Sequence, residues 1–238
     1  MKEERYFYVP EASSACELPP EEAAHAVRVL RMKPGDAAVL MDGCGTFYRA
    51  EIEEASPRRC AYRITGAEPQ QRAWRGRITV AVAPTKNMDR MEWLAEKATE
   101  VGVDCIQPLL CACSERKEIK AARMEKIVVS AMKQSRKAWK PQVGGMLPVG
   151  EFVAGRRGGG KYIAHCNPGP KADLFGELKK DPGGDVTILI GPEGDFTEDE
   201  VAAAVAGGYV PVSLGSSRLR TETAALEAVV LAWLSRRV

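Results

Sequence analysis

The sequence predicts an α/β protein in two parts, a small N-terminal β-barrel over residues 1–70 and an α/β domain over residues 76–238. Up to about Ala67, the chain consists mostly of short β-like runs separated by turn signals, such as K-P-G-D at residues 33–36. From Arg77 onward, strand-like and helix-like segments alternate, which predicts a mostly parallel sheet covered by helices. A chain of 238 residues, 45% of them hydrophobic, is long enough for two such cores.

The first part is expected to hold four short strands and one helix. The helix follows Pro19-Pro20, has Glu21 and Glu22 at the positive end of its dipole, and continues through Leu30. Strands this short and regular are typical of a compact barrel. The polar stretch 68–75 is expected to be the linker. The strands are expected at residues 5–9, 37–42, 46–54 and 58–67.

The second part is expected to alternate five strands with five helices. The helix over 87–101 has an apolar face that includes Met91 and Leu94, and Gly102 is expected to end it with a left-handed cap. The strands are expected at residues 77–84, 104–110, 161–166, 186–191 and 209–215. The other helices are expected at 121–138, near 174, at 197–206 and at 221–236.

Charge and cysteine content limit the possible functions. The net charge is only +2, but nine basic residues face three acidic ones between residues 114 and 140, which fits either a phosphate-binding face or an ordinary solvated helix. The seven cysteines lack the paired spacing of zinc sites, so we expect reduced thiols and no metal. No apolar run is long enough to span a membrane and the N-terminus does not read as a secretory leader, so we expect a cytoplasmic protein without a membrane partner.

Common nucleotide-binding loops are not evident. The glycine-rich stretch 155–161 has the spacing of a phosphate-binding P-loop, but Tyr162 stands where the loop needs Ser or Thr, and a strand follows it rather than a helix. We interpret it as a surface turn. No G-x-G-x-x-G follows the first strand of the second part either.

Two late loops carry the strongest functional signal. I-G-P-E-G-D-F at residues 190–196 and L-G-S-S-R-L-R-T-E-T-A at 214–224 each follow an expected buried strand, and ligands of open α/β sheets bind at the carboxyl ends of the strands. Two glycines in the first loop permit a close backbone approach, and Thr221 is placed to cap the last helix. Each loop alone is ordinary, but together they point to a ligand site.

With these two loops, nearly the whole chain resembles the SPOUT superfamily of methyltransferases and, within it, the 16S rRNA (uracil-N3)-methyltransferase family. The opening R-Y-F-Y-V, the stretch 25–31 and the segment E-K-A-T-E-V-G at 96–102 resemble the same family. The chain departs from the family's usual form around Gln134, where Lys133 replaces Glu and Arg136 is shifted by one position.

The resemblance implies a PUA-like RNA-binding barrel that is followed in the sequence by a trefoil-knotted α/β methyltransferase domain. It also implies a homodimer and S-adenosyl-L-methionine as cofactor. It implies a substrate, one uridine of 16S rRNA within the 30S subunit of the ribosome, and hence a role in rRNA processing and ribosome biogenesis. The cofactor-binding residues it implies are Leu189, Ile190, Gly191, Pro192, Glu193, Gly194, Leu214, Gly215, Leu219, Arg220 and Thr221.

Uracil N3 must lose its proton before it can attack a methyl group, so the site needs a base or a cation that stabilises the imide anion. The candidate catalytic residues are Arg220, Glu193 and Arg136, with Glu222 as a second possible base. Helix-end and ion-pair roles are open for each of them. The candidate RNA-binding residues are Arg28, Arg31, Lys33, Lys133, Arg136 and Lys137.

Two other functions fit the same pattern. One is ribose 2′-O methylation by another SPOUT enzyme. The other is a noncatalytic RNA-binding factor in ribosome assembly. Intact late loops argue against the loss of catalysis.

Overall fold

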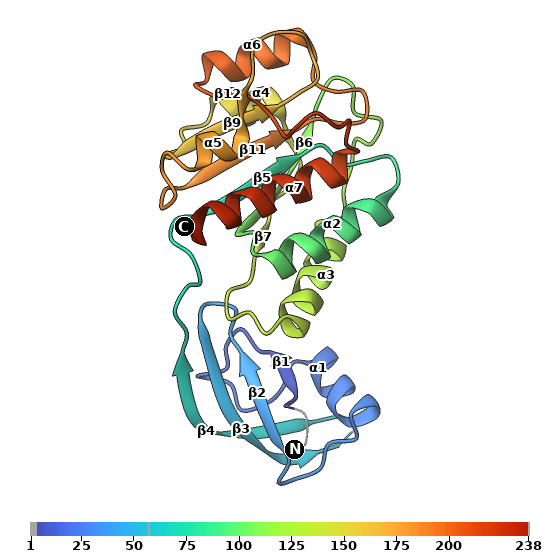
Figure 1. Cartoon of the computed structure of the whole chain (residues 1–238). Coiled ribbons are helices and arrows are strands. Elements are labelled where there is room, and N and C mark those ends of the chain that lie inside the picture. The colour runs from blue at the N-terminus through green and yellow to red at the C-terminus, as the bar shows by residue number, and fades with distance from the viewer. Residues whose placement is uncertain (1–3, 57, 238) are drawn as a thin grey trace. The chain divides into compact units, whose positions relative to one another are not determined.

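A computed structural model describes residues 4–56 and 58–237, and these form two compact units (Figure 1). Unit 1 holds the described residues up to Arg72 together with Val129–Lys140. Unit 2 holds Ala73–Val128 and the described residues from Pro141 onward. The second half of one helix therefore belongs with the N-terminal unit, an assignment that the sequence did not suggest.

Unit 1 is built on a four-stranded sheet in the order β1-β2-β3-β4. The strands are β1 (Tyr6–Tyr8), β2 (Ala37–Met41), β3 (Thr46–Ala55) and β4 (Cys60–Pro69). β1 runs parallel to β2, whereas β2, β3 and β4 are antiparallel neighbours. β4 extends to Pro69, two residues into the predicted linker. Pro69 is tolerated because it ends the strand, where its missing N–H breaks no interior ladder bond.

The predicted helix of unit 1 has two parts, α1 (Pro20–Ala24) and the π-helical turn η1 (His25–Val29). In η1 the wider turn appears in the bond from Leu30 N–H to the His25 carbonyl. The helix and the sheet enclose one core of buried apolar residues. Its largest fully buried members are Phe7, Leu40 and Ile52.

Unit 2 contains a parallel sheet in the order β10-β12-β9-β11-β5-β6-β7, with β8 also paired to β6. Because these neighbours are parallel, the carboxyl ends of β9, β11 and β12 lie at the same edge. The strands are β5 (Ile78–Val82), β6 (Cys105–Leu110), β7 (Gln142–Val143), β8 (Leu147–Pro148), β9 (Gly160–Ala164), β10 (Ala172–Asp173), β11 (Val186–Ile190) and β12 (Val210–Ser213).

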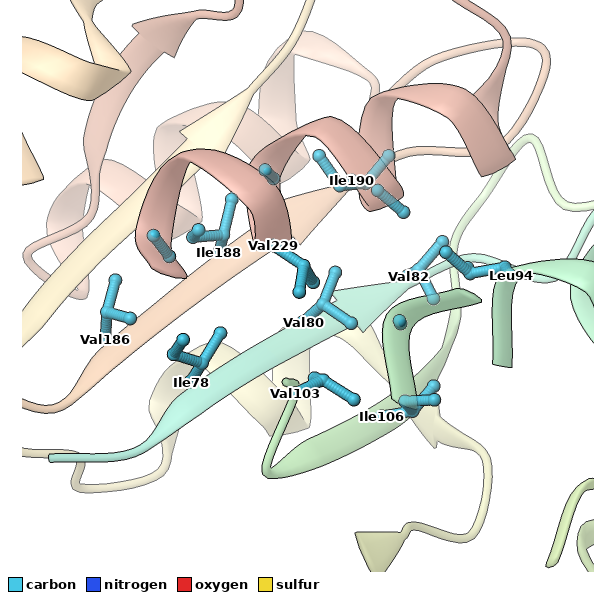
Figure 2. Packing of buried hydrophobic residues seen from close by; sticks show 14 of the residues in the cluster. Ile78, Val80, Val82, Leu94, Val103, Ile106, Val186, Ile188, Ile190 and Val229 are labelled. Atoms are coloured by element: carbon cyan, nitrogen blue, oxygen red, sulfur yellow. The ribbon is translucent and has the colours of Figure 1, made fainter. Parts of the chain in front are cut away.

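Helices cover both faces of this sheet. On one face α7 packs on β5 and β11 between α2 and α5, and on the other face α4 packs against α6. Figure 2 shows Val80 and Ile188 under Val229 of α7. The helices are α2 (Met88–Val101), α3 (Ala121–Gln134), α4 (Val149–Ala154), α5 (Leu174–Leu178), α6 (Glu198–Ala206) and α7 (Thr221–Leu234), followed by the 3-10 turn η2 (Ser235–Arg237).

The pattern of burial in the strands explains why helices cover both faces of the sheet. In β5, Ile78, Val80 and Val82 point into the core under α7, whereas Ala81 belongs to the core on the α4 and α6 face. Every residue of β11 is buried. A run buried on both faces is typical of a central parallel strand, as the sequence predicted for this segment.

The helix predicted over 121–138 was too long, because α3 ends at Gln134. Arg136 adopts a φ of +53°, and the N–H of Lys137 bonds to the Met132 carbonyl, which is the Schellman closure of a helix end. This helix end could not be predicted from the sequence, because an arginine occupies the left-handed position that glycine usually takes. The predicted cap at Gly102 is confirmed, with a φ of +134°.

Short elements were missed. The helix α4 and the two-residue strands β7, β8 and β10 were not predicted, because segments this short show little periodicity. The glycine-rich stretch 155–161 leads from the end of α4 into β9, as a turn before a strand should. None of the helices in the described part of the chain is long and apolar enough to cross a membrane.

Candidate functional site

A cleft of about 840 Å³ lies at the carboxyl edge of the sheet in unit 2. Three loops form it, and each leaves a neighbouring parallel strand: β9, β11 or β12. The volume is in the range of small-molecule sites, about 300–1,000 Å³. The lining combines apolar side chains such as Ile190 and Val212 with charged residues at the rim.

The two loops singled out in the sequence meet in this cleft. Every predicted cofactor-binding residue lines it except Leu189, whose side chain is fully buried in the core on the α4 and α6 face. Two of the predicted catalytic residues, Glu193 and Arg220, also line the cleft. The third, Arg136, belongs to unit 1.

Asp195 joins the loop after β11 to the loop after β9. Its Oδ2 accepts the Cys166 N–H at 2.6 Å and its Oδ1 accepts the Phe196 N–H at 2.8 Å. Its backbone has a φ of +64°, a left-handed conformation in which Asp is among the better tolerated residues. A second bond, from the Asn167 side chain to the Phe196 carbonyl at 3.0 Å, strengthens the same junction.

Glu193 and Gly194 connect the cleft to loops farther along the sheet edge. The Glu193 carboxylate is exposed and accepts the Lys86 N–H at 3.0 Å. A Cβ on Gly194 would lie 2.9 Å from the Cβ of Cys113, so only glycine fits at this approach. Gly191 is also tightly packed, because an added Cβ would lie 3.1 Å from the Phe196 ring.

The loop after β12 presents backbone amides to solvent. Within residues 4–56 and 58–237, the structure gives the amide groups of residues 216–219 no intramolecular hydrogen bond. Gly215 has a φ of +122° and open space where a side chain would be. The predicted cap at Thr221 was wrong, because Thr221 is the first residue of α7 and Arg220 is its N-cap. The Arg220 side chain is exposed, and its carbonyl accepts the Ala224 N–H. Backbone N–H groups without partners, beside a glycine with open space around it, suit a ligand that forms hydrogen bonds with the backbone.

An ion pair between α2 and α7 lies beside this loop. Nε of Arg90 lies 3.7 Å from Oε1 of Glu222, whose side chain is only 9% exposed. Arg90 lines the cleft. Glu222 thus takes part in an ion pair, one of the roles that the sequence left open for it.

His165 follows β9 directly and lines the cleft. Burial, followed by the positive charge of Lys171, lowers the pKa of its imidazole, and the Asp195 carboxylate opposes this shift. Its two ring nitrogens are buried and have no hydrogen-bond partner within the part of the chain that the structure describes. His165 is therefore held as a neutral imidazole at neutral pH.

All predicted RNA-binding residues belong to unit 1. Arg28 lies on η1, and Arg31 and Lys33 follow it, each exposed. Arg31 has a φ of +52°. π-Helical turns and left-handed non-glycine residues both concentrate at functional sites, and here they occur together on a basic segment.

The end of α3 is fastened to this unit through two of the predicted RNA-binding residues. Nζ of Lys133 lies 2.6 Å from Oε1 of Glu22, a nearly buried carboxylate on α1. The guanidinium of Arg136 lies 5.3 Å from the centroid of the Tyr6 ring. Lys133 therefore has a structural partner, whereas Arg136 and Arg31 keep exposed side chains.

The cysteines of the described residues are free thiols. Cys111, just after β6, is buried, and burial raises the pKa of its thiol to about 12, so it stays protonated. Cys113 is exposed beside Gly194. Among the described residues, no three His, Cys, Asp or Glu side chains are grouped to hold a metal ion.

Sequence reasoning missed the third loop of the cleft, with His165 and Lys171, and it missed Arg90 on α2. The strand predicted over residues 161–166 includes His165, but β9 ends at Ala164, so His165 begins the loop at the carboxyl end of the strand. With the strand end placed correctly, the rule applied to the two late loops would have found His165 as well. Arg90 gave no such signal, because only the packing of α2 on α7 brings it to the cleft.

The lining fits S-adenosylmethionine. The apolar residues Ile190, Leu214 and Ala224 suit a purine ring, and the unpaired loop amides suit its ring nitrogens. The charged rim suits an amino acid moiety, because it offers both Arg and carboxylate side chains.

Family models match both units. A model described as an RNA methyltransferase domain matches residues 72–233, and one described as an RNA methyltransferase PUA domain matches residues 18–64. A curated relative in Mycobacterium tuberculosis, named ribosomal RNA small subunit methyltransferase E, is 31% identical over 94% of this chain and 88% of its own length. A relative of the same name in Synechocystis is also 31% identical, over 83% of this chain, and the match spans 65% of the relative's length.

Solved structures agree over nearly the full chain. A probable rRNA-methyltransferase from Porphyromonas gingivalis is 42% identical with a TM-score of 0.90, and 98% of each chain is covered. A ribosomal RNA small subunit methyltransferase E from Neisseria gonorrhoeae, solved bound to S-adenosyl methionine, is 30% identical with a TM-score of 0.81, and 95% of each chain is covered.

Proposed function

The chain belongs to the ribosomal RNA small subunit methyltransferase E family, and we propose that it transfers a methyl group from S-adenosylmethionine to N3 of one uridine in 16S rRNA. It is an S-adenosylmethionine-dependent rRNA methyltransferase with an N-terminal PUA domain. The observation that carries the proposal is the meeting of the two family loops in one cleft at the carboxyl edge of the sheet.

The division of labour follows the two units. The loops after β11 and β12 bind the cofactor through Ile190 to Gly194 and through Leu214, Gly215, Leu219, Arg220 and Thr221. Arg28, Arg31, Lys33, Arg136 and Lys137 of unit 1 bind RNA phosphates, and Lys133 supports them through Glu22. The boundary between residues 70 and 76 separates the RNA-binding and methyltransferase domains, and residues 129–140 work with the first of them.

The reaction requires alignment and one proton transfer. When bound, the cofactor supplies an electrophilic methyl group on a sulfonium centre. The uracil N3 proton leaves first, either to Glu193, whose carboxylate is exposed at the rim, or to water. Arg220 supplies positive charge near the imide anion that results. The N3 lone pair then forms the bond to the methyl carbon as the carbon–sulfur bond breaks.

The physiological setting is part of the proposal. The substrate is the rRNA within the 30S subunit in the cytoplasm, and the enzyme acts as a homodimer. A uracil inside folded rRNA must be unstacked to reach the cleft, so a flipped or single-stranded base is expected.

The test is methylation of 30S subunits that lack the modification, with labelled S-adenosylmethionine and mass spectrometry of the rRNA nucleosides. The proposal expects N3-methyluridine at one position. Label on a ribose would overturn the substrate atom and favour a 2′-O methyltransferase. Binding of RNA without any label would favour a noncatalytic assembly factor.

A further inference from the structure

Arg90 and Glu222 form an ion pair that joins the cleft to the core of unit 2. Arg90 is in the first turn of α2 and Glu222 in the first turn of α7, and these two helices pack against each other. Nε of Arg90 lies 3.7 Å from Oε1 of Glu222. The Arg90 side chain is 36% exposed, whereas that of Glu222 is 9% exposed.

The pairing leaves donors free at the cleft. Oε2 of Glu222 is buried without a partner among residues 4–56 and 58–237, and a buried carboxylate is costly unless a nearby cation compensates it. Arg90 is that cation, and it meets the carboxylate through Nε. In the same described residues its two Nη groups have no hydrogen-bond partner, so they are available to a ligand.

We propose that Arg90, oriented by Glu222, binds a planar anion in the cleft, either the carboxylate of the cofactor or the imide of the deprotonated uracil. This inference rests on the function proposed above. Both anions present two acceptor atoms in a plane, which a guanidinium matches with parallel hydrogen bonds. Glu222 is a positioning residue, because it acts through Arg90.

The other arginines of the cleft are not held in this way. Arg218 and Arg220 are exposed, and the structure gives them no ion-pair partner within the chain segments that it describes. A side chain fixed in advance loses less conformational entropy when it binds. The remaining charged or titratable groups that line the cleft are His165, Cys166, Lys171, Glu193 and Asp195.

If the anion is the imide, Arg90 changes the proton transfer. The N3–H bond breaks, the proton passes to Glu193 or to water, and the electron pair stays on the uracil ring, spread over N3 and the two carbonyl oxygens. Arg90 stabilises that charge, so N3 ionises at lower pH. The pair on N3 then forms the new bond to the methyl carbon, and the pair of the broken carbon–sulfur bond goes to sulfur.

The experiment compares Arg90→Met, Arg90→Lys and Glu222→Gln in the full chain, with Lys180→Met as the control. Lys180 also pairs with a carboxylate, that of Glu177, but lies outside the cleft. Calorimetry measures the affinity for S-adenosylmethionine and for its decarboxylated analogue. Single-turnover methylation of 30S subunits between pH 6 and 9 gives the pH dependence of the chemical step.

Two results support the proposal and identify the anion. A loss of at least about tenfold in S-adenosylmethionine affinity for Arg90→Met, with no loss for the decarboxylated analogue, assigns Arg90 to the carboxylate. Unchanged affinity with a rate profile shifted to higher pH assigns it to the imide. In either case Glu222→Gln gives a smaller change of the same kind, and Arg90→Lys recovers part of the loss.

Other results overturn it. If Arg90→Met matches Lys180→Met in both measurements, Arg90 binds no anion. If Glu222→Gln lowers only the thermal stability, Glu222 does not position Arg90. Wild-type protein that methylates a ribose instead refutes the proposed function rather than this inference, so the two failures are distinguishable.

Discussion

Asp195 shows how one side chain can order a binding cleft. Its two carboxylate oxygens accept backbone N–H groups from two different loops, at 2.6 Å and 2.8 Å. Hydrogen bonds to a charged acceptor are worth about 1.5–3 kcal/mol each. The geometry of the loops after β9 and β11 therefore depends on this residue.

We expect Asp195→Ala to weaken S-adenosylmethionine binding by at least about tenfold and to lower the free energy of unfolding by about 2 kcal/mol. Asp195→Asn keeps one acceptor oxygen and tolerates the φ of +64°, so its losses should be smaller. Calorimetry and urea unfolding measure both quantities. Equal effects of the two variants would show that the hydrogen bonds to Asp195 are unimportant.

His165 makes stability depend on pH. The pKa of its imidazole is lowered from the ordinary value of 6.5, mainly by burial. Above pH 6.5, the group is neutral in both the folded and unfolded chain. As the pH falls below 6.5, the unfolded chain takes up the proton first, so the free energy of unfolding decreases until the folded-state pKa is reached.

We therefore expect the stability of the wild type, relative to His165→Gln, to fall between pH 7 and pH 5. Urea unfolding at both pH values measures it, because groups other than residue 165 cancel in the difference. A difference that stays constant over this range would contradict the burial of a neutral imidazole.

At the scale of elements, the end of α3 is set by the backbone conformation of one arginine. Arg136 has a φ of +53°, which costs a non-glycine residue about 1–2 kcal/mol. Its contact with the Tyr6 ring and the Schellman hydrogen bond of Lys137 offset part of this cost. The helix therefore ends at Gln134, four residues before the predicted end at residue 138.

We expect Arg136→Gly to be more stable than Arg136→Ala by about 1 kcal/mol, the reverse of the usual order in a helix. Both variants lose the contact with the Tyr6 ring, but glycine adopts the positive φ freely, whereas alanine keeps the strain. The midpoints of urea unfolding compare the two variants. Greater stability of the alanine variant would indicate that the helix continues through residue 136.

At the scale of the whole molecule, we propose that the two units separate RNA binding from cofactor binding. The basic segment 28–33 lies in unit 1, and every residue that lines the cofactor cleft lies in unit 2. Because phosphate contacts release counterions, their loss changes both the affinity for RNA and its dependence on salt.

We expect the double reversal Arg28→Glu and Arg31→Glu to weaken 30S binding and to flatten its salt dependence, with unchanged affinity for S-adenosylmethionine. The matched control is Lys179→Glu with Lys180→Glu, which changes the net charge equally on an exposed part of unit 2. Binding measured at several salt concentrations, with calorimetry for the cofactor, provides the test. An equal loss of cofactor affinity would contradict the separation of roles.

The sequence by itself determined the fold class, the order of the long elements and the two loops of the cleft. Buried strands are apolar along their whole length, and long helices repeat their apolar residues at regular intervals. Glycines mark close backbone approaches. Each of these features depends on residues that are close together in the sequence. Leu189 is the one predicted cofactor-binding residue that lies outside the cleft. From the sequence it was indistinguishable from its neighbour Ile190 until the burial of the two faces of β11 was known.

Only the tertiary structure decided which distant side chains meet. Arg90 and Glu222 are far apart in the sequence and pair because α2 packs on α7, and Lys133 is tied to Glu22 because the end of α3 belongs to the N-terminal unit. Such pairs produce no recognisable pattern in the sequence, since the residues around a charged helix position are the same whether its side chain faces solvent or a partner. Their roles follow from packing, which local sequence does not encode.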